Sequence, residues 1–202
     1  MERSDQIEAL GLLEIDGLAR AIRAQDAALK RAPVIILACT PVSPGKAILI
    51  IAGDVASVEE SMTEAEALVG SRHIDRLFLP GIHPRVVSAL RGRRSQRSAE
   101  ALAVLELSSA AATIETADAA VKAAHVDLGR MHLATGFGGK GFFTLWGDQA
   151  EVEAGLLAAT ELGGERVLDH EIIPAPHDEL EAAAFRRPWG LDPADDGSEE
   201  ME

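Results

Sequence analysis

"ALGLLEIDGLARAIRAQDAALKRAPV", residues 9–34, returns without a gap as "ALAVLELSSAAATIETADAAVKAAHV", residues 101–126. Alanine and leucine positions, the Glu14/Glu106 pair and the "DAALK"/"DAAVK" pair all recur 92 residues later. Self-similarity at a fixed spacing indicates repeated structural units. The chain therefore contains two copies of one domain.

The repeat continues on the far side of the next loop, where the spacing becomes 94 residues. "GKAILIIAGDVASVE" at 45–59 matches "GKGFFTLWGDQAEVE" at 139–153, and "IDRLFLPGIHP" at 74–84 matches "LDHEIIPAPHD" at 168–178. The second copy thus carries a two-residue insertion, and it falls inside the glycine-rich stretch "LATGFGGKGFFTLWGD", residues 133–148.

Hydrophobic periodicity and turn residues predict the elements of the first copy. The predicted strands are residues 8–15, 34–40, 47–53 and 74–80, and the predicted helices are 18–31, 55–69 and 83–90. Asp54 is placed to cap the second helix and Gly70 to end it. The first helix is expected to bury a face formed by Leu18, Ala21, Ile22, Ala28 and Leu29.

This order, β-α-β-β-α-β-α in each copy, predicts an α+β, ferredoxin-like domain: an antiparallel four-stranded sheet with its two main helices on one face. The strands are almost continuously apolar, which predicts that both faces of the sheet are covered or that a neighbour buries one of them. We expect domains at 8–90 and 100–184, an Arg-rich linker at 91–99, and an acidic tail at 185–202.

Composition narrows the possible functions. The 202 residues carry a net charge of −14, which argues against nucleic-acid binding. No apolar run reaches the roughly 18 to 20 residues needed to cross a bilayer, and the start "MERSDQIEAL" lacks the pattern of a signal peptide. The single cysteine, Cys39, excludes an intrachain disulfide and suits a reducing cytoplasm. Arg91, Arg93, Arg94 and Arg97 form either an exposed linker, which we favour, or a patch for an anionic ligand.

The glycines at 136, 138 and 141 have the G-x-G-x-x-G spacing of a dinucleotide site, and Lys140 follows a glycine as in a P-loop. A P-loop would need a glycine at Ala134 and a hydroxyl at Gly141. A dinucleotide fingerprint would open a helix, but "FFTLW" after Gly141 predicts a strand. We therefore interpret the stretch as an enlarged loop between two strands.

Taken together, the strand "ALGLLEI", the helix end "DAALKRA", the loop "SPGK" and the helix start "GDVASVE" resemble the bacterial microcompartment (BMC) shell domain. Two unpermuted copies over residues 8–180 resemble the tandem-domain shell proteins, and among them the propanediol-utilisation type. The resemblance implies a structural role. Three chains would form a pseudo-hexameric homotrimer that tiles the shell of a cytoplasmic organelle together with other shell proteins, hexamers and pentamers.

The resemblance also implies roles for particular residues. The loops between the second and third strands would line a central pore for small polar metabolites. In the first copy the loop residues are Ser43, Pro44, Gly45 and Lys46, and in the second they are Thr135, Gly136, Phe137, Gly138, Gly139, Lys140 and Gly141. Lys30 and Lys122 match the lysine that lies along the tile edge in this family. The three Phe137 side chains could narrow the pore.

One departure concerns a cofactor. In a propanediol-utilisation relative, a cysteine follows "GGK" and three copies of it hold an iron–sulfur cluster at the pore. Here Gly141 stands at that position, and Ala47 is its equivalent in the first copy. Cys39 precedes the first loop and is expected to behave as a small buried hydrophobe. We therefore expect no iron–sulfur cluster and no other cofactor.

The remaining polar residues do not suggest an enzyme. His83 and His177 are equivalent through the repeat, but neither has a second ligand at i+3 or i+4, so a shared turn before the last helix explains them better than a metal site. No catalytic residue can be assigned. The alternative to a shell protein is a small-molecule-binding or regulatory trimer of ferredoxin-like domains that does not assemble into a shell.

Overall fold

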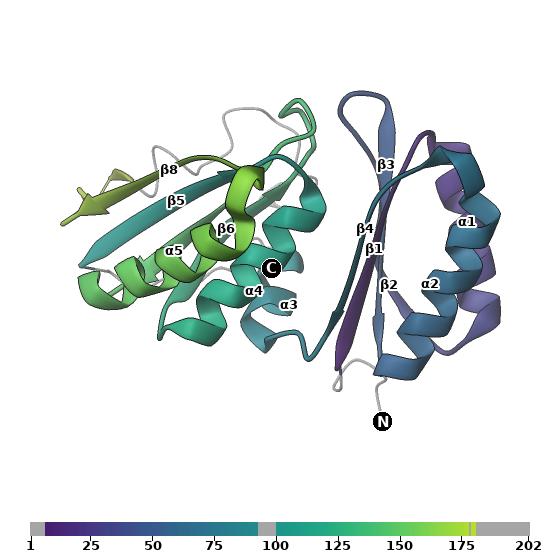
Figure 1. The fold of residues 1–202 in the computed structure, drawn as a ribbon, viewed down its shortest axis with the longest axis horizontal. Coiled ribbons are helices and arrows are strands. Elements are labelled where there is room, and N and C mark those ends of the chain that lie inside the picture. Colours follow the sequence, from purple (N-terminus) through teal and green to yellow (C-terminus); the bar gives the residue numbers. More distant parts are fainter. Residues whose placement is uncertain (1–6, 93–99, 178, 181–202) are drawn as a thin grey trace, which may run out of the picture.

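The computed structural model describes residues 7–92, 100–177 and 179–180 (Figure 1). The first copy comprises β1 (Ala9–Ile15), α1 (Leu18–Arg31), β2 (Ile35–Val42), β3 (Lys46–Gly53), α2 (Val55–Val69), β4 (His73–Pro80) and α3 (Pro84–Leu90). The second comprises β5 (Ala101–Leu107), α4 (Ala110–Ala123), β6 (Asp127–Leu133), β7 (Gly141–Gly147), α5 (Gln149–Gly163) and β8 (Val167–Pro174). A short 3-10 helix precedes the last strand of each copy, at Gly70–Arg72 and Gly164–Arg166.

Two parts of the predicted organisation lie outside the described residues. They are Arg93, Arg94 and Arg97 of the linker and the acidic tail at 185–202. Most of the last helix predicted for the second copy also lies there, and Leu180 is its described helical residue.

Each copy folds as the repeat predicts, into an antiparallel four-stranded sheet. The strand order is β2-β3-β1-β4 in the first sheet and β6-β7-β5-β8 in the second, so the first strand of each copy is paired on both sides. Helices α1 and α2 lie along one face of the first sheet, and α4 and α5 cover one face of the second (Figure 1). The predicted α+β, ferredoxin-like fold is confirmed.

The ends of the helices follow from local chemistry. The Asp54 carboxylate accepts a hydrogen bond from the Ser57 backbone N–H at 2.9 Å, which caps α2 and lowers the pKa of Asp54. Gly70 ends α2 with a φ of 58°, a backbone conformation that favours glycine. Both predicted caps are confirmed. Ser109 caps α4 in the same way, by accepting from the Ala112 N–H at 3.2 Å.

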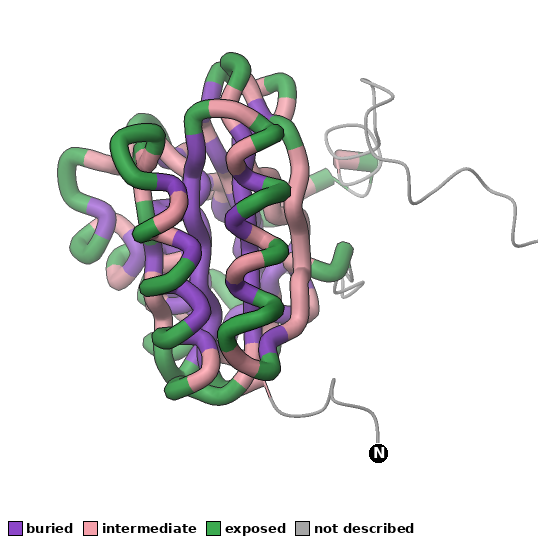
Figure 2. Tube along the Cα trace, turned by 90° about the vertical axis from the view of Figure 1, so that its right-hand side faces the viewer, coloured by how far each residue is buried: buried purple, intermediate pink, exposed green. Residues whose placement is uncertain are grey.

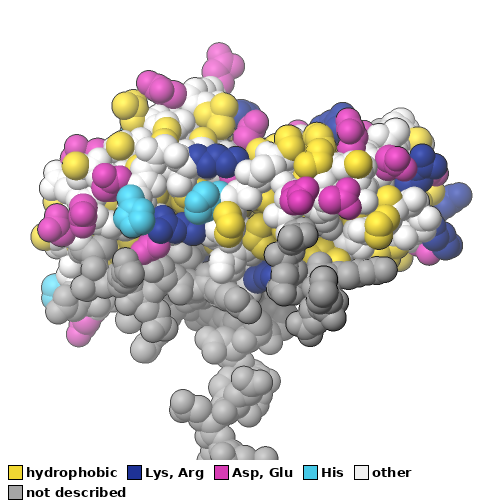
Figure 3. All heavy atoms as spheres, turned by 90° about the horizontal axis from the view of Figure 1, so that it is seen from below, with side chains coloured by type: hydrophobic (Ala, Val, Ile, Leu, Met, Phe, Trp, Pro, Cys, Tyr) yellow, Lys and Arg dark blue, Asp and Glu magenta, His cyan; other side chains and the backbone are white. Residues whose placement is uncertain are grey.

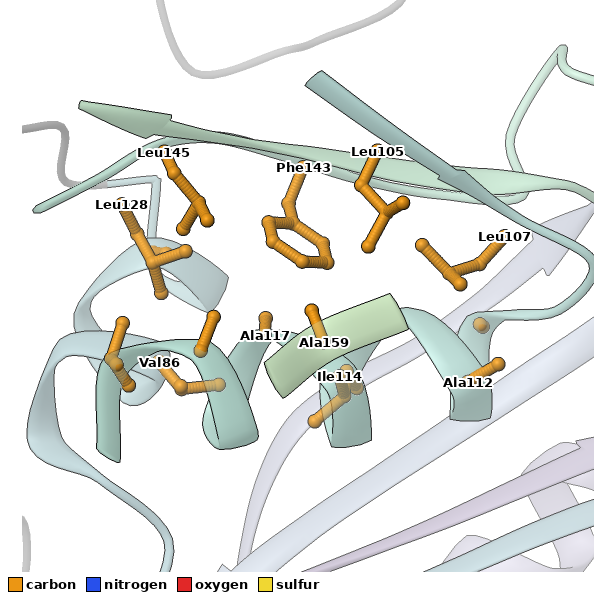
Figure 4. Close-up of a cluster of buried hydrophobic side chains, with 14 of the residues drawn as sticks. Val86, Leu105, Leu107, Ala112, Ile114, Ala117, Leu128, Phe143, Leu145 and Ala159 are labelled. Atoms are coloured by element: carbon orange, nitrogen blue, oxygen red, sulfur yellow. The ribbon is translucent and has the colours of Figure 1, made fainter. Parts of the chain in front are cut away.

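The second domain covers the face of the first sheet that α1 and α2 leave open (Figure 1). Leu10, Leu12 and Ile50 from this face belong to the same buried cluster as Val86 of α3 and Ile114 of α4. Figure 4 shows Phe143 and Leu145 pointing from the second sheet towards α4 and Val86. The two domains thus share a continuous core, and the prediction that a neighbour buries one sheet face is confirmed for the first copy.

The prediction that α1 buries its large apolar residues is wrong. Ala21 and Ala28 are buried against the first sheet, together with Ala24. Leu18, Ile22 and Leu29 are 39%, 55% and 47% exposed. Helix α1 packs through its small residues, and its larger apolar residues are exposed. Figure 2 shows this alternation of buried and exposed residues along the helices that cover the first sheet. Hydrophobic periodicity assigned the small and the large apolar residues to one face of α1, because both sets recur at helical spacing and lie on adjoining faces of the helix.

Among the described residues, no helix is both long enough and apolar enough to span a membrane. On the face seen in Figure 3, acidic and basic side chains are interspersed with apolar ones, and the described residues form no extended basic patch there.

Candidate functional site

The loops of the two copies meet, although they lie 93 residues apart. In the first copy the loop between β2 and β3 is residues 43–45, and in the second copy residues 134–140 join β6 to β7. The Ser43 N–H donates to the Ala134 carbonyl at 3.4 Å, and the Gly136 N–H donates to Ser43 Oγ at 3.1 Å. The loop residues predicted in the two copies therefore lie side by side and form one contiguous surface segment.

The enlarged second loop depends on left-handed backbone. Gly136, Gly138 and Gly139 have φ values of 66°, 63° and 86°, a region that glycine enters without steric cost. A β-carbon at Gly139 would lie 3.4 Å from the Ser43 carbonyl oxygen, an ordinary contact distance, so the positive φ is what favours glycine there. Lys46 and Gly141, both predicted to be loop residues, are the first residues of β3 and β7.

Each loop is anchored by a lysine that pairs with a glutamate of its own central strand. Lys46 Nζ lies 3.0 Å from Glu14 Oε1, and Lys140 Nζ lies 3.2 Å from Glu106 Oε2. The Glu14 side chain is 2% exposed, so Lys46 supplies the opposite charge that a buried carboxylate requires. These ion pairs were not predicted from the sequence. The signal was present, because both the glutamates and the lysines recur in the two copies.

Aromatic packing braces only the second loop among the described residues. The His132 ring stacks on Phe142 with centroids 5.3 Å apart, and Phe137 meets both rings edge-on at 6.1 and 5.8 Å. His132 Nε2 donates to the Thr135 carbonyl at 2.6 Å, and the Lys140 ammonium lies 4.8 Å from the Phe137 ring centroid. Phe137 is therefore held within its own loop.

Gly141, where the resemblance implied a cluster-binding cysteine in related proteins, lies against Thr113 of α4 and against β6. A β-carbon at Gly141 would lie 2.2 Å from Thr113 Oγ1 and 2.9 Å from the His132 carbonyl oxygen, so a side chain there would displace α4 or β6. Cys39 lies on β2, half-buried against the core of the first domain, and burial raises the pKa of its thiol. Among the described residues, no group of three or more His, Cys, Asp or Glu side chains could hold a metal ion.

A polar contact joins the two domains at the seam between α3 and α4. Asp118 is buried, and its Oδ1 accepts from the His83 backbone N–H at 2.7 Å while its Oδ2 pairs with the Lys122 ammonium. His83 Nδ1 accepts from the Arg85 N–H at 3.2 Å, which confirms that this histidine begins the last helix of its copy. The Arg85 guanidinium donates to the Val126 carbonyl across the same seam.

The two predicted edge lysines lie in unequal surroundings. Lys122 is bound to the buried Asp118, whereas Lys30 pairs with Asp26 at 2.5 Å on an exposed stretch of α1. An open depression beside the first loop is lined by Leu18, Pro41, Val42, Ser43, Gly45, Lys46 and Thr135. The start of α1 thus lies beside the first loop.

Comparison with known proteins agrees with this architecture. The BMC domain family model matches residues 9–82 and 101–176. The bacterial microcompartment shell protein PduT of Citrobacter freundii is 37% identical over 175 residues, which cover 86% of this chain and 95% of PduT. A crystal structure of a microcompartment protein from Desulfitobacterium hafniense superposes with a TM-score of 0.83 at 40% identity, covering 88% of this chain and 99% of that one. A fused permuted hexameric shell protein from the RMM microcompartment shares the fold, with a TM-score of 0.57 at 21% identity over 79% of this chain and 87% of that one.

The seam predicts a pH dependence of stability. Burial, then the Arg85 charge, lowers the pKa of His83 below its ordinary value of 6.5, although Asp118 acts in the opposite direction and Lys122 adds to the lowering. Because the folded pKa is lower than the unfolded one, the stabilisation is complete above pH 6.5 and is lost as the pH falls through the folded value. We expect His83→Asn, which keeps a capping acceptor but does not titrate, to lose less stability than the wild type on acidification.

Urea unfolding of both proteins between about pH 7.5 and about pH 5 measures this difference. Parallel curves for the free energy of unfolding would show that His83 does not contribute to the acid sensitivity of the fold.

Proposed function

Since the chain belongs to the family of bacterial microcompartment shell proteins, we propose that three copies of it form a ring of six BMC domains that tiles the shell and surrounds a central pore. Shell proteins of this family are structural, so the chain acts as a building unit of a cytoplasmic organelle and not as an enzyme. The alternative of a trimer that binds small molecules without shell assembly is disfavoured by this membership.

The observation that carries the ring is the difference between the two copies of one helix face. Ile114 on α4 is fully buried at the seam between the domains, whereas its equivalent on α1, Ile22, is 55% exposed. Val121 on α4 and Leu29 on α1 form a second such pair, with Leu29 47% exposed. An apolar face that is buried in one copy and exposed in the other fits an interface with a second chain.

The complementary surface lies at the other end of the chain. At the seam, α4 contacts β4 and α3 of the first copy. The equivalent of β4 is β8, whose outer residues include the exposed Glu171 and the half-buried Ile173. The α1 face and the β8 edge are therefore the equivalents of the α4 and β4 surfaces that meet within the chain. Contact between α1 of one copy and β8 of the next would be head-to-tail, and such contacts form a ring when their rotation closes.

The contact between the two copies is also an argument for a common pore. Within the chain it brings residues 43–45 against residues 134–140, and an equivalent seam between chains would bring the second loop against the first loop of the next copy. Six loops would then form one rim. Because Lys46 and Lys140 are neutralised by glutamates, the rim would present mainly backbone amides and hydroxyls, which suit small polar metabolites.

The outer border of the tile would carry Lys30 and Lys122. The Lys30 side chain is 74% exposed and that of Lys122 is 43% exposed, and a long aliphatic stem can lie on a flat interface while its ammonium reaches carbonyl groups of a neighbour. Hexameric and pentameric shell proteins are the proposed neighbours.

We expect the wild type to have a mass of about 64 kDa in solution, three times the 21.3 kDa of one chain. Ile22→Asp would place an unpaired carboxylate in the interface and weaken trimer formation by more than about 100-fold. The matched control is Leu157→Asp on α5, which changes a residue that is 58% exposed and lies outside the proposed seam. Native mass spectrometry across a dilution series measures both, and equal masses for the two variants would contradict the ring.

Shell assembly is tested by co-expression with a hexameric shell protein followed by electron microscopy. Sheets or closed polyhedra that contain the wild type are expected, and Lys30→Ala is expected to reduce its incorporation while leaving the trimer intact. Arg23→Ala is the matched control, because Arg23 is another exposed cation on α1. Wild-type trimers that remain isolated beside assembled hexamers would contradict the tiling role.

The pore is tested by the passage of a small polar solute into shells of known composition. Phe137→Ala removes the largest side chain of the second loop and its packing against His132 and Phe142, so passage is expected to be faster. Phe137→Leu keeps most of the volume and should stay close to the wild type. An unchanged rate in Phe137→Ala would exclude a narrowing role for this residue.

A further inference from the structure

We propose that the Asp26 carboxylate of one copy accepts a hydrogen bond from the His177 backbone N–H of the next copy, and that this contact is the polar latch of each seam between chains. The inference rests on the proposed ring. It assigns to Asp26 and His177 a role that neither residue has within a single chain.

The proposed contact is inferred from the equivalent contact within the chain, at the seam between α3 and α4. There the Asp118 side chain, 4% exposed, bridges two groups: the His83 N–H at 2.7 Å and the ammonium of Lys122 one helical turn later. A buried carboxylate is stable only when such partners satisfy it. Asp118 therefore requires the His83 N–H, and the requirement fixes how α4 sits against the start of α3.

Each component of this latch recurs in the other copy. Asp26 and Lys30 pair at 2.5 Å on α1, as Asp118 and Lys122 do on α4, but the Asp26 side chain is 61% exposed. His177 Nδ1 accepts from the Glu179 N–H at 3.1 Å, as His83 Nδ1 accepts from Arg85. In the first copy the N–H of the capping histidine donates to Asp118, and the equivalent histidine turn is present at His177. Acceptor and donor are therefore both preformed and lie on the two matching surfaces.

A second polar contact of the internal seam, also beside α3, does not recur. Arg85 donates to the Val126 carbonyl and lies 3.7 Å from Asp127, but Glu179 stands in place of Arg85 and Ile35 in place of Asp127. The arginine contact is thus confined to the seam within the chain. Of these two polar contacts beside α3 and α4, only the aspartate and the backbone N–H are retained on both matching surfaces, which assigns the alignment of this part of the seam between chains to Asp26.

Two substitutions remove the two halves of the latch. Asp26→Ala removes the acceptor, and His177→Pro removes the donor N–H. A hydrogen bond to a charged group supports an expectation of about 10- to 100-fold weaker association per seam for either variant. The double variant should be little weaker than either single one, because each already breaks the same contact. Sedimentation equilibrium or native mass spectrometry gives the trimer dissociation constants.

Matched controls separate the latch from its surroundings. His177→Asn keeps both the N–H and a capping acceptor, and Lys30→Met removes the ion pair of Asp26 but not the acceptor, so both should trimerise nearly as the wild type does. Circular dichroism of each variant as a dilute monomer checks folding, and Asp26→Ala is expected to fold because Asp26 is exposed in the chain.

The outcomes distinguish the latch from the ring. A wild-type trimer that Asp26→Ala and His177→Pro leave equally tight, or effects of the two that simply add, would overturn the latch and leave the ring standing. A wild type that remains monomeric at micromolar concentration would overturn both.

Discussion

The rest of the structure depends on one packing constraint, namely that the first sheet has two apolar faces and its own two main helices cover only one of them. The opposite face, with Leu10, Leu12 and Ile50, is buried by α4 of the second copy and by α3. Domains of about 90 residues bury little surface alone, so each depends on a neighbour for part of its core. The docking of the copies, the meeting of the loops and the burial of Asp118 all follow from this contact.

The repeat made most of the fold predictable. Matching segments at spacings of 92 and 94 residues define equivalent strands and helices, and local signals such as the Asp54 cap and the Gly70 end set their limits. The side of α1 that is buried could not be derived in this way. Ile22 and Ile114 have the same place in the repeat, and only the three-dimensional docking shows that one is exposed and the other enclosed.

The candidate site was only partly predictable for a similar reason. The glycine spacing identified the enlarged loop, and its two-residue insertion marked it as a variant of the first. The contacts that hold the loops are made across strands: Lys46 to Glu14, Lys140 to Glu106, and Ser43 to Gly136. Partners 32 or more residues apart are not adjacent in any local pattern, so they emerge only when the sheet register is known.

Joining two copies in one polypeptide affects how the sequences of the two loops can change independently. In a ring of six identical domains, any substitution appears six times around the axis. In the proposed trimer the short loop at 43–45 and the braced loop at 134–140 are encoded separately, so each would change on three sides while the other stays constant. The aromatic brace of His132, Phe137 and Phe142 is already such a change, since Thr40 and Ile48 occupy the positions equivalent to His132 and Phe142 in the first copy. Covalent duplication would thereby double the number of independent positions that line the proposed pore.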